Sequence, residues 1–255
     1  MSLDLDDILK EWPHEPGQIK VRKITGSDGL EKIQLRLDLG LIQMNLRGRP
    51  DGTRPHGQES SLLYQQIRAK DAGSRGDEFT LTAEECIELQ QEGIQYYHRY
   101  ISLFQLDDFH GVVRDTSRNL DLFNFVKQFA PREEIALSME GFRPYVLMMN
   151  TRARAAIELA RDDLSSALRQ IERGCTKITE ALREAGNVDA IVHSPELRFL
   201  NGWMEELKEK RPLSKLEVLQ TEMDEAIARE AYERAAQLRD EIRAFQQKSK
   251  ESELH

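Results

Sequence analysis

Residue types that mark several protein classes are scarce in this sequence. Its 255 residues include 2 cysteines, 15 glycines and 8 prolines. Cys86 and Cys175 stand alone, without the closely spaced cysteine or histidine ligands that a zinc site or a disulfide framework needs. The small share of glycine and proline argues against a loop-rich chain and favours long regular elements. We therefore expect a regularly folded protein with neither a metal nor another cofactor.

Long apolar runs and nucleotide-binding loops are missing as well. The longest apolar candidate, Tyr145 to Met149, is far shorter than the ~20 residues of a membrane span. The N-terminus is acidic where a secretory signal would be basic, so we expect a cytoplasmic protein without membrane contact. The GxxxxGK[ST] phosphate-binding loop is absent, which argues against a helicase motor.

Positive charge is in deficit. The chain has 36 lysines and arginines against 45 acidic residues, which gives a formal net charge of −9. A nucleic-acid-binding face needs clustered basic residues, so this balance argues against nucleic acid as a partner. Charged residues make up 32% of the chain, above the ~25% of an average soluble domain. We assign most of them to the solvated faces of amphipathic helices.

Three segments near the N-terminus alternate between apolar and polar residues, at 19–24, 33–39 and 41–46. Period-two alternation is typical of strands with one face in the core. We predict a small antiparallel β-meander of two or three strands within an arm formed by residues 1–80. Its polar face would carry Lys20, Arg22, Gln34, Arg36 and Asp38.

The middle of the chain, residues 81–211, has a helical pattern. Thr82 followed by Glu85 fits a capping box, which places a helix start there. Asp107-Asp108 and Asp162-Asp163 each separate two long helical stretches, and the surrounding residues are alike. These turns resemble those between the paired helices of tetratricopeptide repeats, although their spacing of about 54 residues differs from the family's ~34. We predict a tetratricopeptide-like array of helical hairpins, with an irregular helical bundle as the alternative.

The last segment, residues 212–255, contains two apolar stripes at helical spacing. The first stripe comprises Leu216, Leu219, Met223 and Ile227, and the second comprises Tyr232, Ala235, Leu238, Ile242 and Phe245. The short break between them predicts an antiparallel helical hairpin. A hairpin of this size is below the length at which chains usually fold alone, so its apolar stripe needs a cover.

The run YERAAQLRDEIR, residues 232–243, carries a family resemblance. Together with Leu219, Met223 and Ala226, it resembles the UVR motif shared by subunits B and C of the bacterial excision-repair nuclease. The resemblance implies a helical hairpin that mediates subunit contacts, in a setting of DNA repair or stress response. It covers only the segment from about Leu216 to Phe245.

From this hairpin we predict a non-enzymatic interaction or scaffold protein that binds a protein partner, or a second copy of itself as a homodimer. The expected contact residues are Leu219, Met223, Tyr232, Leu238, Arg239 and Ile242. Packing of the stripe within the chain is the alternative. Arg239 and Asp240 form either a cross-hairpin ion pair that fixes the register or an ordinary solvated pair.

Two other readings rest on the N-terminal arm. In the first, a DNA-repair accessory contacts DNA through basic strands and a loop, using Lys20, Arg22, Arg47, Arg49 and Arg54. In the second, the loop before a helix N-terminus binds a small anion or nucleotide through Arg47, Arg49, Arg54 and His56. No serine, cysteine or carboxylate is spaced from His56 in a pattern that indicates a known catalytic mechanism, so we assign no catalytic residue.

Aromatic residues crowd one central helix at Tyr96, Tyr97, His98 and Tyr100, close to Phe104. Further phenylalanines follow on the adjoining helices, so we expect core packing between helices. An aromatic platform for a ligand is the alternative.

Overall fold

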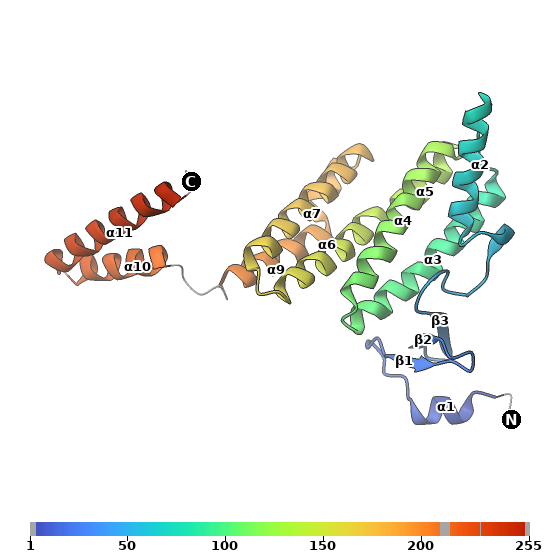
Figure 1. The fold of residues 1–255 in the computed structure, drawn as a ribbon, viewed down its shortest axis with the longest axis horizontal. Helices are drawn as coiled ribbons and strands as arrows, with labels where there is room; N and C mark the ends of the chain where they lie inside the picture. The colour runs from blue at the N-terminus through green and yellow to red at the C-terminus, as the bar shows by residue number, and fades with distance from the viewer. Residues whose placement is uncertain (1–3, 210–214, 230, 253–255) are drawn as a thin grey trace. The chain divides into compact units, whose positions relative to one another are not determined.

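The computed structural model describes residues 4–209, 215–229 and 231–252. By its internal contacts the chain divides into two compact units, residues 1–205 and 206–255 (Figure 1). The finer division into segments 1–80, 81–211 and 212–255 stays a prediction.

The first unit consists of a three-stranded sheet followed by a succession of helices (Figure 1). The strands are β1 (Val21–Thr25), β2 (Glu31–Arg36) and β3 (Leu41–Asn45). Short helical elements in this unit are α1 (Asp6–Glu11), the 3-10 turn η1 (Pro55–Gly57), α5 (Glu133–Glu140) and α8 (Val188–His193). The longer helices that begin in this unit are α2 (Ser61–Arg75), α3 (Ala83–Gln105), α4 (Phe109–Phe129), α6 (Arg143–Leu159), α7 (Leu164–Glu184) and α9 (Pro195–Glu209).

The strands form an antiparallel meander in the order β1-β2-β3, which confirms the predicted arrangement with three strands. The predicted polar face is wrong for the central strand, because Gln34 and Arg36 are buried. Arg36 donates its Nε to the carbonyl oxygen of Trp12 at 2.7 Å, and Gln34 bonds to Gln43 at 2.9 Å. Strand β2 is therefore covered on both faces.

The helices of the first unit follow one another as hairpins, α3 with α4 and α6 with α7 (Figure 1). The two connecting turns have the same geometry. Asp107 and Asp162 adopt left-handed φ values of 55° and 58°, a conformation that aspartate tolerates better than most residues. Asp108 and Asp163 then cap the next helix by accepting backbone N–H bonds from Gly111 and Ser166. The mainly helical fold with hairpins is confirmed.

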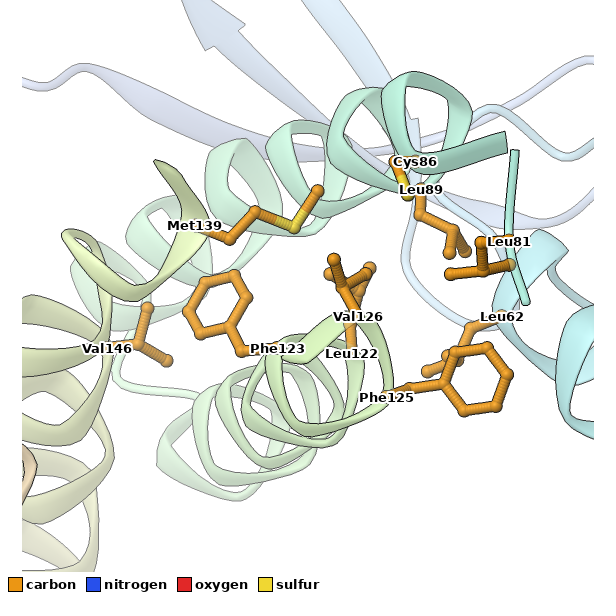
Figure 2. Close-up of a cluster of buried hydrophobic side chains, with 10 residues drawn as sticks. All are labelled: Leu62, Leu81, Cys86, Leu89, Leu122, Phe123, Phe125, Val126, Met139 and Val146. Atoms are coloured by element: carbon orange, nitrogen blue, oxygen red, sulfur yellow. The ribbon is translucent and has the colours of Figure 1, made fainter. Parts of the chain in front are cut away.

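A hydrophobic core lies where α2, α3, α4, α5 and α6 meet (Figure 2). Leu122 and Val126 of α4 are fully buried, and Leu89 of α3 is equally buried. Met139 and Val146 close this core from α5 and α6. Burial raises the pKa of the Cys86 thiol, so this cysteine is a packing residue with little thiolate character.

A pair of buried charges joins the two helices of the first hairpin to the end of the sheet. Arg99 of α3 donates two hydrogen bonds to Asp115 of α4, at 2.6 and 2.8 Å, and both side chains are at most 1% exposed. The remaining nitrogen of Arg99 donates to the carbonyl oxygens of Asn45 and Gly48, at 3.1 and 2.6 Å. This pair therefore fixes the path of the chain after β3.

A second buried carboxylate, Glu92 of α3, holds the start of α2. It accepts the backbone N–H groups of Ser61 and Leu62, at 2.7 and 3.2 Å, which satisfies two donors of the first helical turn. Arg118 and Arg49 neutralise its charge, the latter with 2.9 Å between Arg49 Nε and Glu92 Oε2. The helix start, the loop before it and α4 therefore depend on one carboxylate.

We expect Asp115→Ala to lower the free energy of unfolding of the first unit by about 3–5 kcal/mol, because Arg99 would keep a buried charge without its partner. Chemical denaturation followed by circular dichroism measures this change. Asp121→Ala on the exposed face of the same helix is the control, with an expected effect within about 0.5 kcal/mol. Equal effects of the two substitutions would contradict the assignment.

Candidate functional site

The C-terminal unit is a helical hairpin made of α10 (Lys215–Ala228) and α11 (Tyr232–Ser252). Leu219 and Ala226 of α10 are buried, and so are three residues of α11, namely Ala235, Leu238 and Ile242. Leu238 is the most enclosed, with 1% exposure, and Met223 packs against the cluster. The two helices therefore bury their apolar stripes against each other.

The six predicted contact residues fall into two groups. Leu219, Met223, Leu238 and Ile242 belong to the interior of the hairpin, whereas Tyr232 and Arg239 are on its surface. The side chains of Leu216 and Phe245 lie outside the described residues.

Arg239 pairs with its neighbour Asp240 at 3.2 Å, and both side chains are more than half exposed. This is the ordinary solvated pair rather than a cross-hairpin pair. Within the described residues, Arg234 pairs across the two helices with Glu222 at 3.5 Å, an exposed ion pair worth under ~1 kcal/mol. Apolar packing, rather than charge, therefore sets the register of the two helices.

The turn of the hairpin presents two large exposed side chains. Ile227, at the end of α10, is 48% exposed, and Tyr232, at the start of α11, is 67% exposed. The backbone N–H of Ala231 donates to the carbonyl oxygen of Ala226 at 2.8 Å, which closes the turn. Sequence reasoning placed Ile227 on the inner stripe, because the helical period alone does not show where the partner helix ends.

Comparison with protein-family models identifies this hairpin. A model described as the UvrB/uvrC motif matches residues 214–248. The chain carries a UVR motif. Searches of curated proteins and of solved structures found no match. The UVR hairpin is thus the part of the chain with a named relationship, and the tetratricopeptide resemblance of the central helices stays a prediction.

The arginines predicted to bind an anion do not converge. Arg49 is directed inward to Glu92 and also pairs with Asp51 at 3.2 Å. Burial favours a raised pKa for Asp51, but hydrogen bonds from Thr53 and Gln95 and the charge of Arg49 bring it below its usual value. Arg49 is therefore committed to two carboxylates of its own chain.

The other members of that loop are exposed. Arg47 and Arg54 make no side-chain hydrogen bond or ion pair within the described part of the chain. His56 stacks on Tyr64 with 4.0 Å between ring centroids, and its φ of 51° holds it in the left-handed region. The loop thus offers separate exposed cations rather than a pocket for a phosphate.

The basic strand residues also have partners in their own chain. Lys20 bonds to Glu15 and to the carbonyl oxygen of Pro13, and Arg22 donates to Gln34 at 2.7 Å. The guanidinium of Arg22 lies 4.4 Å from the ring centroid of Trp12. Of the five predicted DNA contacts, Arg47 and Arg54 are therefore the two that the described structure leaves uncommitted.

The described residues show neither a metal-binding cluster nor a membrane-spanning helix. Within them, no cluster of three or more histidine, cysteine, aspartate or glutamate side chains has the arrangement of a metal site. In the same part of the chain, no helix combines the length and apolar character that crossing a membrane requires.

We expect Leu238→Ala to unfold the UVR hairpin or to weaken it by about 2–5 kcal/mol, because it empties the centre of a small core. Tyr232→Ala should change stability by no more than about 0.5 kcal/mol, since that side chain is exposed. Hydrogen exchange of α10 and α11 in the full chain measures both. Equal loss of protection in the two variants would show that Tyr232 is also a packing residue.

Proposed function

We propose that this protein is a non-enzymatic adaptor that binds a partner protein through the turn of its UVR hairpin. One observation carries the proposal. The hairpin satisfies its own core and still presents Ile227 and Tyr232 to solvent on either side of the turn. A folded unit with an apolar tip has the form of a recognition element.

The composition of this tip supports a protein partner. Tyrosine is enriched in the energetically dominant part of interfaces, and a ring of polar residues commonly surrounds it. Here the exposed ion pairs Arg229 to Glu225, at 3.3 Å, and Arg234 to Glu222 adjoin the tip along the two helices. An apolar centre with a charged rim suits a transient contact in aqueous solution.

The rest of the molecule supports an adaptor better than an enzyme. His56 is stacked on Tyr64, and the arginines near it are separate or neutralised. The groups that sequence reasoning considered for chemistry therefore do not form one constellation. We place the protein in the cytoplasm, where partners in DNA repair or stress response would meet it.

We expect a photo-reactive benzoylphenylalanine at position 232 to cross-link the full chain to a defined partner in native cytosol. The same group at position 241, exposed further along α11, should give little product. A second substitution, Ile227→Ser, should reduce the cross-link at position 232 about tenfold, the loss of a hot-spot contact. Mass spectrometry of the adduct separates a foreign partner from a second copy of this chain.

Two outcomes count against the proposal. Equal cross-linking at positions 232 and 241 would show random collision rather than recognition. Persistence of the cross-link in Ile227→Ser would show that the apolar tip does not carry the binding.

We expect no strong binding to DNA, because only Arg47 and Arg54 of the predicted contacts are uncommitted. Two phosphate contacts give a slope of about −2 when the logarithm of the affinity is plotted against that of the salt concentration. Fluorescence anisotropy with labelled duplex and single-stranded DNA measures the slope. A slope of about −4 or steeper that Lys20→Ala flattens would restore the DNA-binding reading.

A further inference from the structure

A pocket of about 480 Å³ opens between α3, α4 and the segment that runs from α5 into α6. Its volume falls in the range of small-molecule sites. Figure 2 shows part of its wall, where the side chains of Phe123, Met139 and Val146 lie close together. Leu122 and Ile94 extend the apolar lining.

The lining carries no formal charge. Aspartate, glutamate, lysine and arginine are all absent from the residues that form the pocket wall. His98 lines the pocket, and burial lowers its pKa, which keeps the imidazole neutral near pH 7. A charged ligand would lose its hydration here without gaining a counter-charge.

Three phenol side chains meet in this pocket. Tyr97 lies 5.5 Å from Tyr100 and 6.2 Å from Tyr145, measured between ring centroids. Tyr100 is 1% exposed and lines the pocket, so its small accessible area faces the pocket space. Within the described residues, none of the three hydroxyls makes a hydrogen bond to the protein.

The surroundings of Tyr100 agree with this clustering. Burial, followed by the neighbouring phenols of Tyr145 and Tyr97, raises its pKa. Burial raises the pKa of Tyr145 as well. The hydroxyls of Tyr100 and Tyr145 therefore stay protonated and can both donate and accept a hydrogen bond. Tyr100 is buried, Tyr145 is half-buried and Tyr97 is 37% exposed, so their hydroxyls, which lack a partner in the protein, are open to a polar group of a ligand in the pocket.

Two apolar side chains at the mouth of the pocket are exposed to solvent. Ile94 is 48% exposed and Phe142 is 57% exposed, and both belong to the lining. Access from solvent therefore needs no large rearrangement. The amide of Asn119 is already engaged, since its nitrogen donates to the carbonyl oxygen of Gly93 at 3.0 Å. The phenols remain uncommitted, as do the side chains of Gln90 and His98 in the same wall.

From this geometry we infer that the first unit binds a small, uncharged, largely aromatic or apolar molecule, whose single polar group bonds to the hydroxyls of Tyr97, Tyr100 and Tyr145. The inference concerns a different unit from the UVR hairpin and does not depend on the adaptor proposal. The apolar body would fill the space beside Phe123 and Met139, with the polar group at the phenols.

Four naphthalene probes of similar size test this inference on the full chain by ligand-observed NMR titration. They are 2-acetylnaphthalene, 2-ethylnaphthalene, 2-naphthoate and 2-naphthylmethylammonium. We expect 2-acetylnaphthalene to bind with one-to-one stoichiometry, and the anion and the cation to bind at least about tenfold more weakly. Comparable affinities for neutral and charged probes, or no binding of any probe, would overturn the inference.

Tyr100→Phe removes one hydroxyl without disturbing a bond in the described structure, so the variant should fold normally. The variant should bind 2-acetylnaphthalene about three- to tenfold more weakly, which corresponds to the loss of one hydrogen bond, and its affinity for 2-ethylnaphthalene should not change. Tyr64→Phe, which removes a hydroxyl outside the pocket, should change neither affinity. Equal loss for both probes in Tyr100→Phe would overturn the assigned role of the phenols.

A second copy of the chain is the competing occupant of the pocket mouth. Sedimentation of the wild type and of Phe142→Ser distinguishes it. An unchanged mass supports a ligand site, whereas conversion of a dimer into a monomer would show that a second copy covers the mouth and would overturn the inference.

Discussion

Two buried carboxylates, Glu92 and Asp115, impose the constraint on which the first unit depends. Both side chains are 0% exposed, and an isolated charge in such a place is prohibitively costly. Each must therefore be met by cations and N–H donors from other elements. Arg99 donates hydrogen bonds to Asp115 and to the carbonyl oxygen of Gly48 after β3. Arg49, in the loop before α2, forms an ion pair with Glu92. One requirement thus fixes the sheet, the loop and three helices together.

That constraint also decides what the arginine-rich loop is for. Positively charged loops before a helix often bind anions from solution, because the first N–H groups of the helix are free. In this protein the N–H groups of Ser61 and Leu62 already have an anion, the carboxylate of Glu92. The loop satisfies an internal charge, so we propose functional surfaces elsewhere, at the hairpin tip and at the phenol-lined pocket.

Local sequence patterns predict local structure well. They do not predict which residues far apart in the sequence contact each other. The capping box at Thr82 is formed, and the acidic turns at Asp107 and Asp162 adopt one geometry, because each depends on residues a few positions apart. The prediction for Arg36 and Gln34 is wrong, since alternation cannot show that the segment after α1, at Trp12, contacts a second face of the sheet. The same limit applies to the hairpin, where Ile227 continues an apolar stripe beyond the reach of α11.

At the phenol-lined pocket, the aromatic residues of the sequence predict a packed core, but the structure leaves a space between them. Tyr100 is buried as core packing requires, yet it lines a pocket that the surrounding side chains do not fill. Gly93 stands in the middle of α3, where glycine costs about 1 kcal/mol relative to alanine. A methyl group there would meet Leu122 and Asn119 only at ordinary contact distances of 3.8 and 3.9 Å, so close helix packing does not demand glycine. The missing side chain enlarges the pocket instead, which is what a ligand site needs and a packed core does not.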